Sequence, residues 1–369
     1  MSDSSPQSLV EVYKFGGSSV RDAEAFKRSA NLVALNPQCR LVVVSATYNS
    51  TNRLEQIYKF QAEGDLTKAK ESLQALEDHH RAIEQDLGLT PSALWSQFQK
   101  QLTDFKTAKG KEKVLDEIYS WGERASSEIF AKLLNQKAQA VLFDAREVIL
   151  TSDDHQHASP LRSDIKEAAT RLLKPLLSSS VVVTQGFIGK TKQGATTTLG
   201  REGSDFSATL FAEAIEASSV TIWTDVAGVA SFDPKLMPEF CWLDHLSFSE
   251  ARILATGGAK VLFPRTLDPV EALKIPVWVR SSYESQARGT LISDVPTEKF
   301  AMALKESGDK AELSLVGSSK QVDKILSEFG ELFFASQKKP WGAIIELPKS
   351  LSLETTQKIH AALLKTVSK

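Results

Sequence analysis

The stretch that constrains this chain most runs from Val181 to Glu216 and predicts a strand, a glycine-rich turn and a helix. Residues 181–184 (VVVT) form a short β-branched run, which is typical of a buried strand. Glycines at 186, 189 and 194 predict turns, and apolar residues at helical spacing predict a helix that begins near Ser204 and Asp205. Such a junction leaves backbone N–H groups free at the positive end of the helix dipole. The sequence therefore predicts an α/β crossover that can bind an anion.

Arg201 lies just before this helix, where its guanidinium can hold a carboxylate or phosphate through two parallel hydrogen bonds. Ser204 and Asp205 suit the N-cap and the first turn of the helix. The alternative is a well-capped structural crossover with a surface arginine. The rest of the chain is needed to separate the two interpretations.

A second glycine turn follows an expected strand at Leu9–Phe15, where Lys14 precedes the pair Gly16 and Gly17. Adjacent glycines let the backbone approach a ligand and leave N–H groups free to cradle phosphate oxygens. Lys14 at the strand end can reach a transferring phosphoryl group as a point charge. The alternative is a solvated lysine beside a turn.

Two further expected strands end in polar residues. The run 41–46 (LVVVSA) has hydroxyls at and just after its carboxyl end, which include Ser45 and Thr51. The run 220–223 is followed by Thr224 and Asp225. Ligands of open α/β sheets bind at the carboxyl ends of the strands. The turn-rich loop 226–234 ends at Asp233 and Lys235, which suits recognition of a nucleoside, and Lys260 is a second candidate phosphate cation.

A helical, highly charged pattern covers residues 53–120 and indicates an insertion or lid rather than a second domain. His79 and His80 are adjacent and therefore point to different faces of a helix, unlike a metal pair, so we expect both to be solvated. Another helix is expected to start at Trp121, with Glu123 in or near its first turn. The helix dipole favours a glutamate there, so a structural role is a fair alternative to a functional one.

Chain length and charge set further bounds. The 369 residues suit one large α/β domain and a small one, and from about Phe300 onward the pattern changes to β-α-β-β-α. The formal net charge of -2 gives no indication of nucleic acid or an anionic membrane as a partner. Residues 1–8 are polar and expected to be disordered, and they lack the apolar core of a signal peptide, so we expect a cytoplasmic protein.

Metal sites and several nucleotide-binding motifs have no support. Cys39 and Cys241 are the only cysteines, and the ligand-like cluster Asp153, Asp154, His155 and His157 has no visible orienting partner, so we predict no metal-ligating residues. There is no Walker A loop, no GxGxxG after a strand, no nucleophile elbow and no protein-kinase signature. Two glycine turns, lysines, an arginine and strand-end carboxylates remain, and they suit phosphoryl transfer.

Eight motifs in order resemble the aspartate kinases of the amino acid kinase family, over about Val12–Ile292. They are KFGGSS (14–19), VVSAT with STNRL, WGERASS (121–127), FDAREV (143–148), TQGFIGKTKQGATTTLGREGSD (184–205), WTDVAGVASFDPK (223–235), GGAKVLFPRT and IPVWVRSS. The resemblance implies a three-layer α/β amino acid kinase fold with a mainly parallel central sheet over residues 9–295. It also implies a single, shortened ACT-like α+β domain over 300–369, without a visible closing strand, and a homodimer.

The activity implied by the resemblance is transfer of a phosphoryl group from MgATP to the side-chain carboxylate of L-aspartate, the first step of the pathway to lysine, threonine and methionine. Lys14 and Asp205 would be catalytic. Ser45, Thr51, Glu123, Arg201 and Ser204 would form the amino-acid pocket. Lys14, Gly16, Gly17, Thr224, Asp225, Asp233, Lys235 and Lys260 would hold ATP. No general base is required, because the acceptor carboxylate is ionised at neutral pH.

Three residues depart from the family pattern: Glu202 stands where many members have glycine, Ala230 where an aromatic is usual, and Lys235 where arginine is usual. The shortened tail predicts weak or absent feedback inhibition. Two alternatives stay open at this point. One is a related kinase acting on glutamate, acetylglutamate, carbamate or UMP, and the other is a catalytically silent amino-acid sensor that keeps the pockets.

Overall fold

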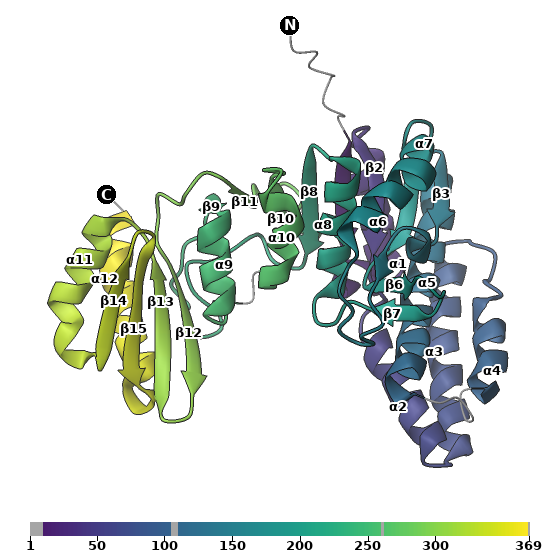
Figure 1. Ribbon diagram of the computed structural model, residues 1–369, viewed down its shortest axis with the longest axis horizontal. Coiled ribbons are helices and arrows are strands. Elements are labelled where there is room, and N and C mark those ends of the chain that lie inside the picture. Colours follow the sequence, from purple (N-terminus) through teal and green to yellow (C-terminus); the bar gives the residue numbers. More distant parts are fainter. Residues whose placement is uncertain (1–9, 105–109, 260–261, 368–369) are drawn as a thin grey trace, which may run out of the picture. The chain divides into compact units, whose positions relative to one another are not determined.

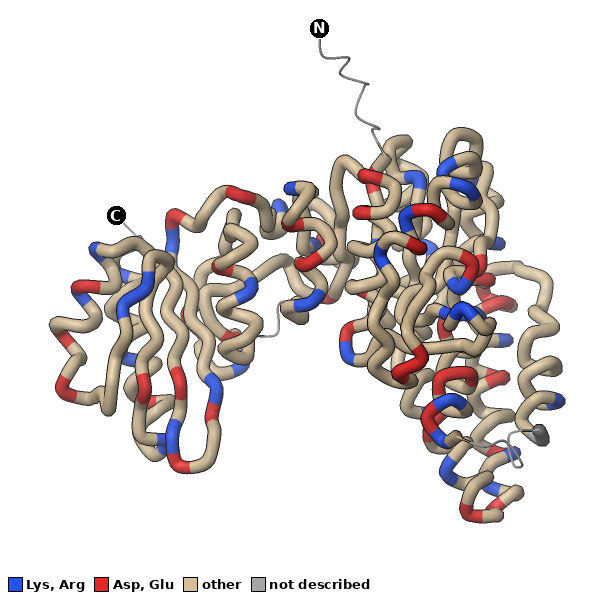
Figure 2. The backbone as a smooth tube through the Cα atoms, in the orientation of Figure 1, with Lys and Arg blue, Asp and Glu red and all other residues tan. Residues whose placement is uncertain are grey.

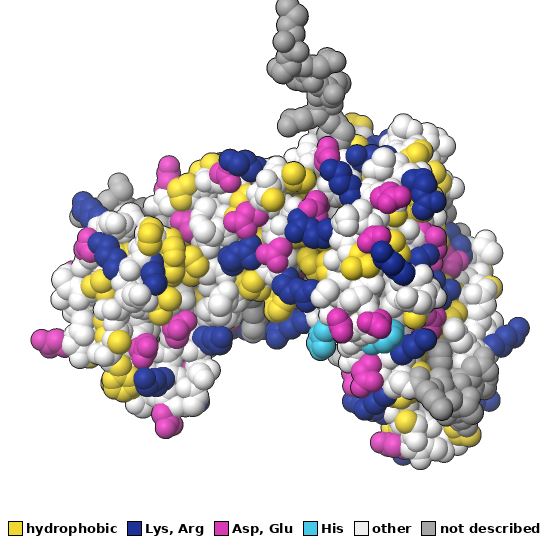
Figure 3. Space-filling model, in the orientation of Figure 1, with side chains coloured by type: hydrophobic (Ala, Val, Ile, Leu, Met, Phe, Trp, Pro, Cys, Tyr) yellow, Lys and Arg dark blue, Asp and Glu magenta, His cyan; other side chains and the backbone are white. Residues whose placement is uncertain are grey.

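The computed structural model describes residues 10–104, 110–259 and 262–367, in two compact units that divide after Asp225. The expected disorder of residues 1–8 and the candidate Lys260 lie outside the described residues. Charges of both signs are interspersed along the tube of each unit (Figure 2), and charged and apolar side chains are intermixed on the face seen in Figure 3. Among the described helices, none is both long and apolar enough to cross a membrane.

A parallel sheet forms the centre of the first unit, as predicted (Figure 1). Its strands, in the order β3-β5-β2-β1-β8, are β3 Ala140–Phe143, β5 Val181–Gln185, β2 Cys39–Val44, β1 Glu11–Phe15 and β8 Ser219–Thr224. All four neighbouring pairs are parallel. The strands are short, and β1, β2, β5 and β8 are mostly buried on both faces, as a sheet covered by helices requires, whereas β3 is a partly exposed edge strand.

Helices cover both faces of this sheet (Figure 1). They are α1 Ala23–Ala34, α5 Lys111–Asn135, α6 Arg162–Ala168, α7 Lys174–Leu177 and α8 Gly203–Ile215. Phe15 packs against Phe130 of α5 and Trp223 of β8, with ring centroids 5.3 and 6.2 Å apart. Because side chains alternate along a strand, Lys14 points to the opposite face from Phe15, which is the face that α8 covers.

The glycine-rich stretch after β5 folds as a hairpin rather than as turns alone. β6 Ile188–Thr191 pairs with β7 Thr196–Thr198, and β4 Leu150–Thr151 adds a third strand to this small sheet. A Cβ on Gly189 would lie 2.6 Å from the carbonyl oxygen of Ile149, so the close approach of β4 and β6 requires glycine there. The sequence pattern missed these strands because they are short and broken by glycine.

The expected helical insertion is present and belongs to the first unit. It contains α2 Ser50–Ala62, α3 Leu66–Asp86, α4 Leu94–Asp104 and the first half of α5. Leu54, Trp95, Phe98 and Trp121 form its buried core. The prediction that a helix starts at Trp121 is wrong: α5 begins ten residues earlier, so Glu123 lies in the middle of a long helix rather than in a first turn.

The second unit begins with β9 His245–Ser247, α9 Phe248–Thr256, α10 Asp268–Glu271, β10 Val277–Ser281 and β11 Thr290–Ser293, with strand order β10-β11-β9. Serine 247 caps α9 through a capping box with Glu250.

The rest of the second unit is a four-stranded antiparallel sheet with two helices (Figure 1, yellow-green to yellow). The predicted β-α-β-β-α order is confirmed as β13 Lys310–Val316, α11 Ser319–Phe329, β14 Ala335–Lys339, β15 Gly342–Pro348 and α12 Ser352–Val367. No strand follows α12 among the described residues, as expected, but the sequence pattern missed a strand that precedes the unit. β12 Ala301–Ser307 pairs with β13 along its whole length, in the sheet order β12-β13-β15-β14. Its exposed, polar second half hid it from the hydrophobic pattern.

Candidate active site

One cavity of about 690 Å³ in the first unit brings together most of the predicted site residues. Eight of them line it: Lys14, Gly17, Ser45, Thr51, Glu123, Arg201, Ser204 and Asp225. They come from the carboxyl ends of β1, β2 and β8, from the first turn of α2, from α5 and from the start of α8. The neighbouring β1, β2 and β8 run parallel, so their carboxyl ends lie at the same edge of the sheet, where ligands of such sheets bind.

Lys14 and Asp205 form a buried ion pair beside this cavity. The Lys14 Nζ lies 2.6 Å from Asp205 Oδ1, and the two side chains are only 9% and 8% exposed. Asp205 is in the first turn of α8, as predicted, where the helix dipole favours a carboxylate. The pair therefore fixes the lysine ammonium at the edge of the cavity.

The two glycines after β1 allow this packing. A Cβ on Gly16 would lie 3.3 Å from Lys14 Nζ, and one on Gly17 would lie 2.9 Å from the carbonyl oxygen of Ala46. Gly16 itself donates its N–H to the Trp223 carbonyl, while Gly17 lines the cavity. Larger side chains would push the turn away from both β2 and the lysine.

Glu123 is the least satisfied polar group of the cavity. Its side chain is 3% exposed; Oε1 accepts only a long hydrogen bond of 3.4 Å from Ala46 N–H, and Oε2 has no hydrogen-bond partner among the described residues. Burial raises the pKa of this carboxyl to about 8, against the lowering by its backbone hydrogen bonds. A buried carboxylate is costly unless it is paired, so the Glu123 oxygen without a hydrogen-bond partner is a suitable site for a cationic group of a ligand.

Arg201 lies just before α8, as predicted, whereas Ser204 does not occupy the position that the sequence pattern gave it. The helix begins at Gly203, its N-cap is Glu202 with φ 54° and no side-chain cap, and Ser204 is the second helical residue. The prediction that Ser204 suits the N-cap is therefore wrong. Arg201 is exposed and lines the cavity, so its guanidinium is free to meet a ligand from the solvent side.

The nucleotide candidates are divided between the two units. Thr224 and Asp225 end β8, joined by a 3.1 Å hydrogen bond, and Asp225 lines the cavity. Asp233 and Lys235 lie in the second unit, where the Asp233 carboxylate accepts the Lys235 N–H at 3.0 Å and so shapes a turn. Ala230 pairs with Trp242 in an isolated bridge of the same unit.

Several cavity residues were not predicted from the sequence, among them Tyr119, Gln156, His157 and Phe187. The loop that carries two of them is anchored by Asp116 of α5, which is fully buried. Asp116 accepts the His155 Nδ1–H at 2.7 Å, the Gln156 N–H at 3.1 Å and the Thr198 hydroxyl at 2.6 Å. This anchor is the orienting partner that the His-Asp cluster lacked in the sequence.

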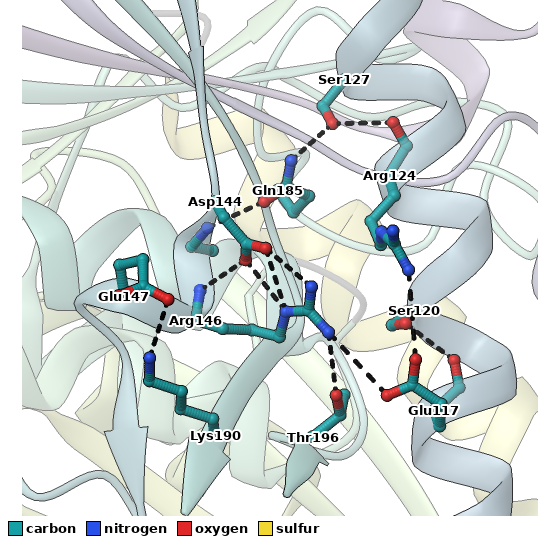
Figure 4. Close-up of polar contacts among 11 residues, drawn as sticks. Glu117, Ser120, Arg124, Ser127, Asp144, Arg146, Glu147, Gln185, Lys190 and Thr196 are labelled. Carbon is teal, nitrogen blue, oxygen red and sulfur yellow. Dashed lines mark hydrogen bonds and ion pairs between the residues drawn. The ribbon is translucent and has the colours of Figure 1, made fainter. Parts of the chain in front are cut away.

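The FDAREV motif has a bracing role beside the site rather than in it (Figure 4). Arg146 grips the Asp144 carboxylate with Nη2 at 2.7 Å and Nε at 3.0 Å, and its Nη1 donates to Thr196 at 3.0 Å. Burial alone would raise the pKa of Asp144, but the hydrogen bonds and charge of Arg146 outweigh it and hold that pKa below its usual value. The brace ties the end of β3 to β7, next to the cavity wall at Thr198.

A Gly186→Ala change tests how tightly α8 must approach β5. The added Cβ would lie 2.6 Å from Ser204 Cβ and 2.8 Å from Ser204 Cα, so the start of α8 has to move. We expect a loss of about 1–3 kcal/mol in the free energy of unfolding, together with weaker binding at the cavity. Urea denaturation measures this, and Gly330→Ala, whose Cβ would meet no atom within 4 Å, is the matched control. Equal midpoints for the two variants would contradict this packing.

A profile of the amino acid kinase family matches residues 10–281, which is most of the chain. The chain is 39% identical over 311 residues to the lysine-sensitive aspartokinase 3 of Escherichia coli (strain K12), an alignment that covers 81% of this chain and 68% of that protein. Most other aspartokinases that it matches are longer, so the chain spans 52–64% of their length.

Two solved structures of E. coli aspartokinase III resemble the fold. The complex with lysine and aspartate (T-state) gives a TM-score of 0.80 at 28% identity and covers 96% of this chain and 100% of that chain. The complex with aspartate and ADP (R-state) gives a TM-score of 0.74 at 34% identity, with coverages of 96% and 83%. The predicted family resemblance and α/β fold are thereby confirmed.

Proposed function

Because the chain belongs to the aspartate kinases of the amino acid kinase family, we propose that it phosphorylates the side-chain carboxylate of L-aspartate with ATP. The products are 4-phospho-L-aspartate and ADP, and the reaction is the first step of the aspartate-family amino acid pathway. The R-state relative was solved with aspartate and ADP, which supports both substrates.

The observation that carries this proposal is that one cavity contains both a buried carboxyl group with an unpartnered oxygen and a buried lysine held by an ion pair. Glu123 Oε2 lacks a partner among the described residues, and Lys14 is held by Asp205 on the same cavity. An acceptor with both an ammonium and carboxylates matches this set. The α-ammonium of aspartate pairs with Glu123, and its α-carboxylate takes the fork of Arg201.

In this arrangement, catalysis rests on positioning and on neutralising charge. The acceptor carboxylate is already ionised and attacks the γ-phosphorus, so the chain needs no general base. Lys14 stabilises the negative charge on the transferring group and on the bridging oxygen that leaves with ADP. Asp205 holds the lysine side chain in position through their ion pair, and the hydroxyls of Ser45, Thr51 and Ser204 orient the amino acid.

We propose that Mg²⁺ enters with ATP. Such sites hold the ion largely through substrate phosphates and water, and we predict no metal-ligating side chain from this chain. No group of three or more His, Cys, Asp or Glu side chains is placed to hold a metal in the parts of the chain that the structure describes. The ion, when bound, neutralises phosphate charge. Thr224, Asp225, Asp233, Lys235 and Lys260, with Gly16 and Gly17, remain the proposed nucleotide contacts.

We propose two domains, a catalytic domain at 9–295 and a regulatory domain at 300–369. The regulatory domain contains the four-stranded antiparallel sheet and is the proposed single ACT-like domain. The paired β12 lies at the edge of its sheet, and Leu313, Leu315, Ile345 and Ile359 belong to a buried core that also includes Phe232 and Met237 from before the proposed boundary. A homodimer through this unit and a cytoplasmic location are part of the same proposal.

Acceptor specificity tests the proposal against its enzymatic alternatives. ADP formation from MgATP is measured by a coupled assay with L-aspartate, L-glutamate, acetylglutamate, carbamate and UMP in turn. We expect turnover with L-aspartate and at most a few per cent of it with the others. Turnover only with another acceptor would assign the chain to a different kinase, and saturable aspartate binding without turnover would favour the sensor.

A lysine and threonine titration tests the effect of the shortened tail. Two ACT modules are usual in the family, and the described residues form one such sheet, so for this 369-residue chain we expect little inhibition by either amino acid below about 1 mM, a weak affinity for a metabolite. Initial rates at fixed aspartate and MgATP measure the effect. Half-inhibition at micromolar lysine or threonine would contradict the expectation.

A further inference from the structure

His80 is buried in the helical insertion, contrary to the prediction that it is solvated. It lies on α3, is 0% exposed and packs its ring against Trp95, with centroids 4.8 Å apart. Its neighbour His79 is partly exposed, as expected of an adjacent position that faces another direction. A fully buried imidazole must satisfy both ring nitrogens or lose stability.

Both nitrogens of His80 have partners, and these fix the tautomer. Nδ1 lies 2.9 Å from the Leu76 carbonyl oxygen, which can only accept, so Nδ1 carries the proton. Nε2 is then the acceptor and lies 3.1 Å from the Thr47 hydroxyl, which donates to it. The Thr47 oxygen in turn accepts from the Ser50 hydroxyl. Burial lowers the pKa of His80 to about 4, which keeps the ring neutral near pH 7.

At its other end, this hydrogen-bond chain reaches the loop 45–51, which lines the proposed amino-acid pocket. Thr47 lines the cavity and stands between Ser45 and Thr51, which also line it. The preceding residue Ala46 donates its N–H to Glu123, and Ser126 of the same helix donates to the Ser45 carbonyl at 2.6 Å. The loop is thus held by α5 on one side and by His80 on the other.

We propose that His80 is a positioning residue for the aspartate pocket: through Thr47 and Ser50 it holds the loop 45–51 in the conformation that receives the amino acid. The inference rests on the proposed function, because it concerns the same pocket. His80 does not line the cavity and acts only through Thr47. The proposed amino-acid contacts Ser45 and Thr51 belong to this loop, whereas the nucleotide candidate Gly17 only packs against it at Ala46, so we expect the main effect on the amino-acid substrate.

His80→Phe tests the proposal, because phenylalanine keeps an aromatic ring against Trp95 and removes the acceptor for Thr47. Because the loop loses a buried hydrogen bond that holds it, we expect the KM for aspartate to rise about tenfold, which corresponds to about 1.4 kcal/mol. The KM for ATP and kcat should stay within about twofold. His79→Ala changes the neighbouring residue, which takes no part in this hydrogen-bond chain, and should leave kcat and both KM values unchanged.

The partner side gives an independent pair of variants. Thr47→Val removes the donor and should raise the KM for aspartate as His80→Phe does, whereas Thr47→Ser keeps the hydroxyl and should restore it. The double variant His80→Phe/Thr47→Val should be less than additive, because both changes break one bond. If His80→Phe does not fold, the Thr47 pair decides alone.

An unchanged KM for aspartate in His80→Phe or Thr47→Val would overturn the inference, as would an equal rise in His79→Ala. A fall in kcat together with rises in the KM values for both aspartate and ATP would show a merely structural role and would also overturn the inference. Wild-type turnover with aspartate is measured in the same series. Its absence would count against the proposed function, whereas wild-type turnover with unaltered variants counts against the His80 inference alone.

Discussion

Lys14→Ala is expected to lower kcat by about three orders of magnitude while aspartate still binds with near wild-type affinity. The lysine is fixed by Asp205 at 2.6 Å at the edge of the cavity, where developing phosphoryl charge is stabilised. Removing one preorganised charge of this kind costs roughly 3–4 kcal/mol in the transition state. Because the aspartate contacts proposed here are Glu123 and Arg201, calorimetric binding should survive. Steady-state rates at saturating MgATP measure the loss.

Stability must be separated from catalysis in this experiment, since the change leaves the buried Asp205 carboxylate without its cation. Removing one partner of a buried pair costs about 3–5 kcal/mol. The double variant Lys14→Ala/Asp205→Asn removes both charges, so it should recover much of that stability and none of the activity. Lys166→Ala, an exposed lysine on α6, is the control. Activity in a folded double variant within tenfold of wild type would contradict the assigned role of Lys14.

Glu123→Gln is expected to abolish measurable aspartate binding and to stabilise the ligand-free protein above pH 8. The carboxyl has a pKa of about 8 in the folded chain, raised by burial from its ordinary 4.5. The folded state therefore holds a proton that the unfolded state has released between those two values. This contribution to stability is full below pH 4.5 and is lost as the pH rises to about 8. Glutamine carries no such penalty.

Thermal unfolding from pH 6 to 9 measures the effect. We expect the melting temperature of wild type to fall relative to Glu123→Gln as the pH rises to 8, with Glu112→Gln, an exposed residue of α5, tracking wild type. Binding has the opposite sense: an ammonium ligand needs the ionised carboxylate, so the KM for aspartate should fall from pH 6.5 to 8 and binding at pH 7 should release a proton. A pH-independent KM together with tight aspartate binding by Glu123→Gln would contradict this role.

The parallel sheet and most of its helices were predictable because β-branched runs and apolar periodicity record burial directly. Val181–Gln185 and α8 are examples, and the glycines at 16 and 17 marked a real close approach. The helix containing Glu123 was placed wrongly because nothing in local propensity separates a first turn from a continuing helix. The strand β12 was missed because half of its residues face solvent.

The sequence predicted the charged residues of the site but not the residues that hold its loops in place. Lys14, Glu123 and Arg201 stand in recognisable motifs, whereas Asp116 and His80 act through contacts made between distant segments. Thr47 and His80 are 33 residues apart, and Asp116 and Thr198 are 82 apart. Such pairings arise only when the insertion packs on the sheet, and a single sequence carries no local signal for them.

Direct detection of the acyl phosphate tests the central claim best. Purified protein is incubated with MgATP and L-aspartate in hydroxylamine, which displaces phosphate from an acyl phosphate to give a hydroxamate, detected as its coloured ferric complex. L-Glutamate is the matched acceptor and Lys14→Ala the inactive control. The account predicts hydroxamate with aspartate alone, in equal amount to the ADP formed, and none in the control. ADP without hydroxamate, or hydroxamate formed equally from glutamate, would contradict it.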